Sequence, residues 1–142
     1  MPKRPSKDEY YLNIAFVVSQ RSTCLKRHYG AVIVKNDRIV STGYNGAPAG
    51  EPNCCDIFEV CPRMSEPHNS GNYAGCPAAH AEQNAIISAS KEEMIGATLY
   101  LAGLDMADGE EIFDISPCPV CARIIKNAGI KRVVGLCGDI KI

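Results

Sequence analysis

The spacing of hydrophobic residues in the first third of the chain predicts one helix followed by a β-hairpin. From about residue 8 to 24, four positions of low polarity recur at helical spacing: Leu12, Ala15, Phe16 and Ser19. Two β-branched runs follow, at 31–34 and 38–42, and the residues between them, 35–37, favour a turn. We therefore expect an amphipathic helix and then two antiparallel strands.

The second half of the chain alternates between helical and strand-like patterns. Helical spacing resumes at 81–90 and again at 118–129, where Gly129 marks the expected helix end. Residues 96–104 and 131–137 are apolar runs that predict buried strands. Strands that alternate with helices predict an α/β fold with helices on the faces of a sheet. The absence of an internal repeat and the length of 142 residues favour a single domain over residues 1–142.

Residues 45–75 differ from both halves. Glycine, proline, asparagine and three cysteines crowd this stretch, which has no convincing period. An irregular segment of this length is unusual in a compact domain. We expect this segment either to carry a function or to be held in place by a cross-link.

Composition and charge narrow the class of protein. Hydrophobic residues make up 46% and charged residues 22%, as in ordinary globular proteins. No apolar run reaches the roughly 18 residues of a membrane span, and the N-terminus lacks a signal-peptide core, so we expect a cytoplasmic protein without a membrane partner. The net charge of −1 gives no general attraction to nucleic acid. A small-molecule substrate is favoured.

The number of cysteines indicates metal binding. Reducing conditions in the cytoplasm disfavour a disulfide framework, so metal ligation is the leading explanation for eight cysteines. They are Cys24, Cys54, Cys55, Cys61, Cys76, Cys118, Cys121 and Cys137. Cys137 stands in the apolar segment "VVGLCGDI", which predicts a buried small hydrophobic residue.

Two motifs at expected helix starts predict a catalytic metal site. Cys118 and Cys121 can reach one ion, and the helix N-terminus helps to keep both thiols deprotonated, although a single CxxC also occurs in redox motifs and structural knuckles. His80 adds a nitrogen ligand, and three ligands leave the open position that is typical of a catalytic zinc. Glu82 could move protons between a water molecule there and a substrate.

Each residue also has a plainer interpretation, because His80 could cap a helix and Glu82 could complement the positive helix end. Together, HxE followed by PCxxC matches the signature of zinc-dependent base deaminases.

Over most of its length the chain resembles the cytidine/deoxycytidylate deaminase superfamily. The HAE motif at 80–82 and the PCPVC motif at 117–121 carry this resemblance. Within the superfamily, GAVIV at 30–34 and GYNGAP at 43–48 are similar to the branch that acts on dCMP. The resemblance implies a cytidine deaminase-like three-layer α/β/α sandwich with a mixed five-stranded sheet.

The resemblance also implies a reaction. Zinc would be bound by His80, Cys118 and Cys121, with Glu82 as the proton shuttle. The reaction would be the hydrolytic deamination of dCMP to dUMP and ammonia, which supplies dUMP for thymidylate synthesis. The alternatives are a deaminase of dCTP, cytidine or tRNA adenosine, or a non-catalytic zinc-stabilised interaction module. Glu82 discriminates against the module, because a purely structural site needs no carboxylate beside an open metal position.

Three further residues are candidates for substrate binding. Asn45 matches the family asparagine that touches the sugar or base, although it could also be a turn residue before a glycine. Lys26 and Arg27 precede the first expected strand, where the family often carries a basic residue for the 5′-phosphate. Solvated surface charge is the alternative for both.

Phage-type relatives carry a second, structural zinc. Cys24 and either Cys54 or Cys55 match two of its ligands, while Cys61, His68 or Cys76 would have to supply the others. The competing hypothesis is free thiols in a loop that is ordered by subunit contacts. Family members are commonly hexamers activated by dCTP and inhibited by dTTP, so the resemblance also implies a homo-oligomer and nucleotide effectors.

Overall fold

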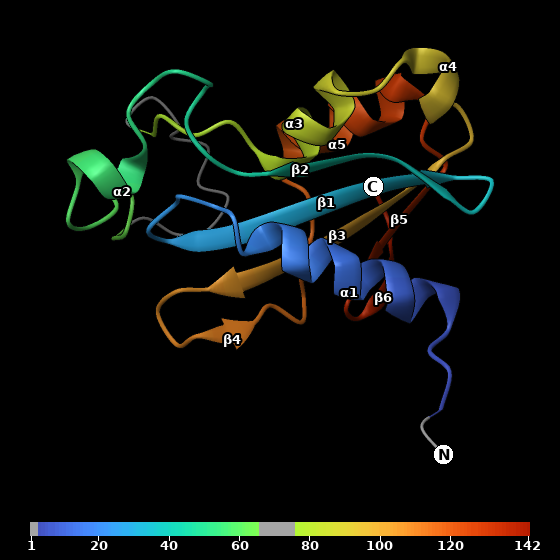
Figure 1. The fold of residues 1–142 in the computed structure, drawn as a ribbon, viewed down its shortest axis with the longest axis horizontal. Helices are drawn as coiled ribbons and strands as arrows, with labels where there is room; N and C mark the ends of the chain where they lie inside the picture. Colours follow the sequence, from blue (N-terminus) through green and yellow to red (C-terminus); the bar gives the residue numbers. More distant parts are fainter. Residues whose placement is uncertain (1–2, 66–75) are drawn as a thin grey trace.

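A mixed sheet with helices on both faces forms the protein, and this computed structural model describes residues 3–65 and 76–142 (Figure 1). The strands in this described part are β1 (Arg27–Lys35), β2 (Arg38–Tyr44), β3 (Thr98–Asp105), β4 (Glu110–Glu111), β5 (Arg132–Gly135) and β6 (Gly138–Ile140). The helices are α1 (Lys7–Ser19), α2 (Cys54–Ile57), α3 (Ala81–Ile87), α4 (Lys91–Met94) and α5 (Pro119–Ala128). None of the described helices combines the length and apolar character needed to cross a membrane.

The order of the strands confirms the predicted mixed sheet. Five strands follow the path β2-β1-β3-β5-β6, and the short β4 pairs only with β3. The pair β3 and β5 is parallel, whereas β1 pairs with β2 and with β3 in antiparallel fashion. The chain crosses from β3 to β5 through α5, and this crossover brings the start of α5 close to the start of α3.

The hairpin of β1 and β2 forms where the sequence predicts it. Its turn residues Asn36 and Asp37 have φ values of 52° and 60°, the left-handed conformation that a two-residue type I′ turn requires. Asparagine and aspartate tolerate this conformation better than most residues. Both strands extend further than the β-branched runs alone predict.

Alternating residues of the central strands build two cores. On β1, Ala31 and Ile33 face the layer of α3 and α5, whereas Val32 and Val34 face α1. Strand β3 repeats the pattern with Leu99 and Leu101 on one side and Tyr100 and Ala102 on the other. Because side chains alternate between the faces of a strand, this pattern produces the three-layer sandwich.

Helix α1 is shorter than predicted, since it ends at Ser19 rather than near Cys24. It begins with a capping box between Ser6 and Glu9, and it buries Tyr11, Ala15 and Ser19. The polar residues that follow Ser19 offer no apolar side chain to the sheet, so the helix has nothing to pack after that point.

Strand β2 holds α3 through close main-chain contacts. A Cβ atom at Gly43 would lie 2.4 Å from both the Ala81 oxygen and the Ala85 nitrogen, so the helix lies directly on the strand backbone. The Ser41 hydroxyl donates a hydrogen bond to the Ala85 carbonyl at 2.7 Å. The Asn84 side chain donates to the last carbonyl of β2 at 2.8 Å. The start of α3 is therefore fixed relative to the sheet.

The prediction for Cys137 is wrong, because this residue is exposed. Leu136 and Cys137 form the tight turn between β5 and β6, in which Gly135 pairs with Gly138. The predicted strand over 131–137 therefore stops at Gly135, and a two-residue turn places its side chains in solvent. A pattern of apolar residues cannot by itself reveal such a reversal.

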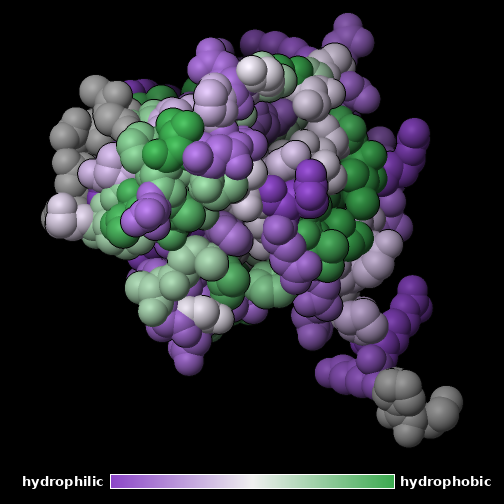
Figure 2. Space-filling model, turned by 60° about the vertical axis from the view of Figure 1, so that its left-hand side comes forward, coloured by the Kyte–Doolittle hydropathy of each residue, from purple (hydrophilic) through white to green (hydrophobic). Residues whose placement is uncertain are grey.

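The segment of α2 lies at one end of the molecule. Exposed hydrophobic side chains in and after this helix include Ile57, Val60 and Met64. This end is turned toward the viewer in Figure 2, where hydrophobic and hydrophilic patches alternate. Within the predicted irregular stretch of 45–75, α2 is the one helix among the described residues.

Candidate active site

The starts of α3 and α5 bring three metal-ligand side chains together. His80 is the N-cap of α3, and Cys118 is the N-cap of α5. Pro119 occupies the first helical position after Cys118, where its missing N–H is harmless. The Cys118 sulfur accepts a hydrogen bond from the Cys121 backbone N–H at 3.4 Å. This local turn points both thiols in the same direction.

The spacing of these side chains fits a zinc ion. The His80 Nδ1 atom lies 3.2 Å from the Cys121 sulfur and 3.5 Å from the Cys118 sulfur. Zinc bonds of about 2.3 Å to sulfur and 2.0 Å to nitrogen at a tetrahedral angle separate the two ligand atoms by roughly 3.5 Å. Within residues 3–65 and 76–142, no other group of three or more potential ligands lies within 4.8 Å of one another.

The electrostatics of the three groups also suit a cation. The Cys121 thiol donates to the Cys118 sulfur, and this hydrogen bond, together with His80, lowers the pKa of Cys118 to about 3. The same donation raises the pKa of Cys121. The hydrogen bond with Cys118 raises the pKa of His80. A thiolate is therefore already favoured at Cys118, and a divalent cation would take the place of the protons on the other two groups.

Glu82 is a buried carboxyl group beside these ligands. Its side chain is only 5% exposed, and it lies in the first turn of α3. Burial raises its pKa, and the neighbouring His80 acts in the opposite direction. A carboxyl group with a raised pKa holds a proton more readily, which suits a group that accepts a proton and gives it back.

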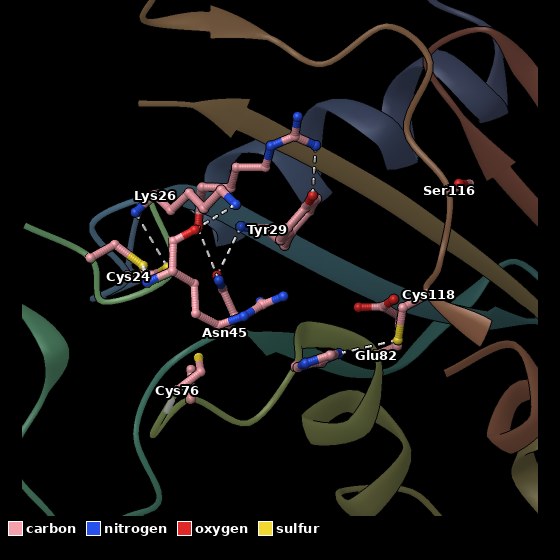
Figure 3. A pocket seen from close by; sticks show the side chains of 13 residues that line it. Cys24, Lys26, Tyr29, Asn45, Cys76, Glu82, Ser116 and Cys118 are labelled. Carbon is pink, nitrogen blue, oxygen red and sulfur yellow. Dashed lines mark hydrogen bonds between the residues drawn. The ribbon is translucent and has the colours of Figure 1, made fainter. Parts of the chain in front are cut away.

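A pocket extends from this centre to the start of β1. Figure 3 shows Glu82, Cys118 and Ser116 on one side and Lys26 and Cys24 on the other. Asn45 lies between the two groups. An elongated molecule could therefore place one end at the metal ligands and the other near a positive charge.

Asn45 lies in the pocket, but the hydrogen bonds of its side chain hold β1. Its Oδ1 accepts from the Tyr29 N–H at 2.8 Å, and its Nδ2 donates to the Arg27 carbonyl at 2.9 Å. A primary amide can form further hydrogen bonds. The predicted contact with substrate therefore remains a prediction, and the alternative of a simple turn residue understates its role.

The two predicted basic residues have different surroundings. The Arg27 guanidinium lies 3.4 Å from an Asp105 carboxylate oxygen and donates to the Tyr29 hydroxyl at 3.1 Å. The Lys26 ammonium instead donates to the backbone carbonyl of Arg63 at 3.1 Å. Both residues line the pocket.

Arg63, Tyr29 and Ser116 also line the pocket and were missed from the sequence. Arg63 stands in the irregular stretch, where a single charge is indistinguishable from ordinary surface polarity. Tyr29 looks like any aromatic residue of a strand, and Ser116 shows only its proximity to the PCPVC motif as a signal.

Four of the remaining cysteines gather near the Lys26 side of the pocket. Cys24, Cys61 and Cys76 line it, and Cys54 is buried with a pKa raised first by burial and then by these neighbouring thiols. Cys55 is exposed. Among the residues that the structure describes, these thiols do not form a group at ligand spacing. The second zinc stays a prediction, and its candidate His68 lies outside the described residues.

Comparison with known proteins identifies the family. Residues 5–137 match the family model described as the cytidine and deoxycytidylate deaminase zinc-binding region. The chain belongs to the cytidine and deoxycytidylate deaminase family. Zinc is therefore the cofactor of this deaminase-family chain, as the sequence predicts, and the cluster of His80, Cys118 and Cys121 offers ligands that suit it.

Named relatives of this deaminase-family chain come from several sources. The chain is 42% identical over 137 residues to deoxycytidylate deaminase of Mycobacterium phage D29. That alignment covers 92% of this chain and 94% of the relative. It is 37% identical over 133 residues to deoxycytidylate deaminase of Schizosaccharomyces pombe, but there it spans only 37% of the relative's length. The dCMP deaminase of cyanophage S-TIM5, solved in complex with dCMP and dUMP, aligns with a TM-score of 0.65 at 29% identity over 94% of this chain and 83% of that one. The predicted cytidine deaminase-like fold is confirmed.

Proposed function

We propose that the protein converts dCMP and water into dUMP and ammonia. The observation that carries this proposal is the position of the buried Glu82 beside His80, Cys118 and Cys121 at one side of an open pocket. A structural zinc site has no use for a buried carboxyl group in this position. The names of the relatives support dCMP as the substrate.

Metal binding and proton transfer would be carried out by different residues of this chain. Zinc bound by the His80, Cys118 and Cys121 set supplies Lewis-acid activation of a water molecule, whose pKa it lowers to about 7. Glu82 accepts a proton from the water that attacks C4 of the cytosine ring and delivers it to N3. Glu82 then takes the proton of the hydroxyl group now on C4 and gives it to the amino group, so that the C4–N bond breaks, C4 becomes a carbonyl carbon and ammonia leaves. The burial of Glu82 favours this role, because it raises the pKa of the carboxyl group and so strengthens it as a proton acceptor.

The pocket also bears on the choice among substrates. Lys26 lies on the side away from Glu82, so a substrate with a phosphate beyond its sugar finds a positive charge there (Figure 3). The net charge of −1 disfavours tRNA, whose backbone requires a broad basic surface. Among deaminase substrates, a free nucleotide is therefore favoured over tRNA adenosine or unphosphorylated cytidine.

Ammonia release from dCMP, dCTP, CMP, cytidine and deoxycytidine tests the proposal. We expect the highest kcat/KM with dCMP. The Glu82→Gln protein should retain its zinc and its melting temperature but lose about 10²- to 10⁴-fold in kcat, because its amide cannot accept the proton. Preference for an unphosphorylated nucleoside would overturn the substrate, and turnover retained by Glu82→Gln would overturn the role of Glu82.

Further properties belong to the same proposal. We infer that residues 1–142 act as a single domain, which is supported by the family match over 5–137. The exposed hydrophobic side chains of Ile57, Val60 and Met64 support the expected homo-oligomer, a hexamer in the family. Regulation by dCTP and dTTP and a cytoplasmic location remain expectations from the resemblance. Size-exclusion chromatography with light scattering tests the oligomer.

A further inference from the structure

We propose that Gln83 is a positioning residue for the metal ligand His80. Its side chain holds the main chain of His80 in the conformation that turns the ring toward Cys118 and Cys121. This inference rests on the ligand set of the proposed function, but it does not depend on which nucleotide the protein deaminates.

The main chain of residues 79 and 80 is held at four polar groups. Ala79 and Gly46 form an isolated bridge, in which the Ala79 N–H donates at 2.8 Å and the Gly46 N–H donates at 3.1 Å, each to the other's carbonyl. The His80 carbonyl accepts from the Asn84 N–H at 3.0 Å. The His80 N–H donates to the Gln83 Oε1 atom at 2.8 Å. Three of the four groups pair with main chain, so only the His80 N–H depends on a side chain for its partner.

The position of the His80 main chain determines where its ring can lie. The atom that faces the sulfurs is Nδ1, which lies 3.2 Å from the Cys121 sulfur and 3.5 Å from the Cys118 sulfur. Only the χ1 and χ2 torsions separate Nδ1 from the main chain, so a rotation of the main chain moves this atom directly. Both cysteines belong to the start of α5 and do not follow such a rotation. Loss of the contact with Gln83 would therefore separate the ligand atoms.

Stabilisation of α3 alone is the plainer role for Gln83. The helix is already fixed to β2, because the Ser41 hydroxyl donates to the Ala85 carbonyl and the Asn84 side chain donates to the Tyr44 carbonyl. These contacts place the helix as a whole without Gln83. The contribution of Gln83 is confined to the residue that carries the metal-binding ring.

The same contact occurs at the starts of three other described helices, where the acceptor is a carboxylate. Glu9 in α1, Asp56 in α2 and Glu93 in α4 accept from the N-cap N–H at 3.2, 3.2 and 3.0 Å. The geometry thus accommodates an acid as well as an amide. A carboxylate in the first turn also suits the helix dipole, so Gln83→Glu is a conservative replacement that can keep the hydrogen bond.

Zinc affinity, measured by competition with a chelator, tests the inference without turnover. We expect Gln83→Leu to weaken zinc binding by about 10- to 100-fold, because leucine offers no acceptor and contacts that orient a metal ligand typically have this effect. Gln83→Glu should return the affinity to the wild-type value or above. The visible absorption of the Co²⁺-loaded proteins reports the geometry of the ligands, and it should change in Gln83→Leu but not in Gln83→Glu.

Glu9→Leu is the matched control, since it removes the same kind of acceptor at the start of α1, on the opposite face of the sheet. It should lower the melting temperature and leave the zinc affinity unchanged. The inference is overturned if Gln83→Leu binds zinc as tightly as the wild type, if Glu9→Leu loses as much affinity, or if folded Gln83→Glu does not recover it.

A shorter amide keeps the test open if Gln83→Leu does not fold. Gln83→Asn lacks one methylene group and cannot bring its oxygen to the His80 N–H at the same distance, so zinc should again bind more weakly. Wild-type zinc affinity in Gln83→Asn would contradict the positioning role. Ammonia release from dCMP by the wild-type protein separately decides the proposed function.

Discussion

Substitution of Gly43 by alanine tests whether β2 sets the position of the catalytic carboxyl group. The added Cβ would lie 2.4 Å from the Ala81 oxygen and the Ala85 nitrogen, whereas ordinary contact begins at 3.4 Å. Both atoms belong to the backbone of α3, so no side-chain rotation can relieve the clash. The helix must therefore move by about 1 Å, and it carries His80 and Glu82 at its start.

The magnitude follows from this displacement. Overpacking of a well-packed contact costs about 1–3 kcal/mol, which corresponds to a melting temperature lowered by about 3–10 °C for a chain of this size. A shift of about 1 Å at a catalytic group can reduce the rate by about 10²-fold. We therefore expect Gly43→Ala to lose substantially more activity than its loss of stability explains at 25 °C.

Three measurements check this prediction: the melting temperature, the zinc content and kcat for dCMP. Gly96→Ala is the control, because Gly96 has a φ of 78° and no neighbour within 4 Å of the added Cβ. It should lose about 1 kcal/mol through backbone strain while keeping kcat. The reasoning is refuted if Gly43→Ala keeps the wild-type kcat, or if both variants lose activity in proportion to stability.

Two other predictions concern the metal and pH. Metal analysis of the purified protein should give two zinc ions per chain if the loop cysteines bind the second ion. Cys121→Ser should then remove only the ion beside Glu82. A single zinc ion in the wild-type protein would eliminate the second site. The Arg132 guanidinium donates to both carboxylate oxygens of Asp8 at 3.0 and 2.7 Å, and this contact lowers the pKa of Asp8. The stabilisation by this pair is fully present above the unfolded pKa of about 3.9, and it is lost as the pH falls through the lower folded pKa. The melting temperature of Asp8→Asn should therefore fall less steeply than that of the wild type between about pH 5 and pH 2. An unchanged pH profile in Asp8→Asn would contradict the role of this pair.

Local patterns predict those parts of the molecule that local chemistry determines. The turn at Asn36 and Asp37 follows from residues that accept a left-handed backbone. His80, Glu82 and the two cysteines are recognisable because a metal site requires particular side chains at fixed spacing. The centres of β1 and β3 are predictable because both of their faces are buried there, and residues 30–34 and 99–103 are accordingly apolar.

Features that depend on tertiary contacts escape such patterns. The Arg63 carbonyl accepts a hydrogen bond from the Lys26 ammonium, a contact between residues 37 positions apart that no local pattern predicts. Helix α4 is short and was missed, although Ser90 and Glu93 form a capping box that signals its start. The exposure of Cys137 depends on β6 turning back along β5, and a run of apolar letters does not encode that reversal.

The metal ligands are also a cross-link within the chain. His80 and Cys118 are separated by 38 positions, with the whole of β3 between them. An ion held by both closes this loop, and in a chain-entropy treatment closing a loop of this length lowers the entropy of the unfolded state by an amount equivalent to about 4 kcal/mol. Zinc in this protein would thus contribute to folding as well as to chemistry, and its removal by a chelator should loosen α3 from α5 before it disturbs the hairpin of β1 and β2.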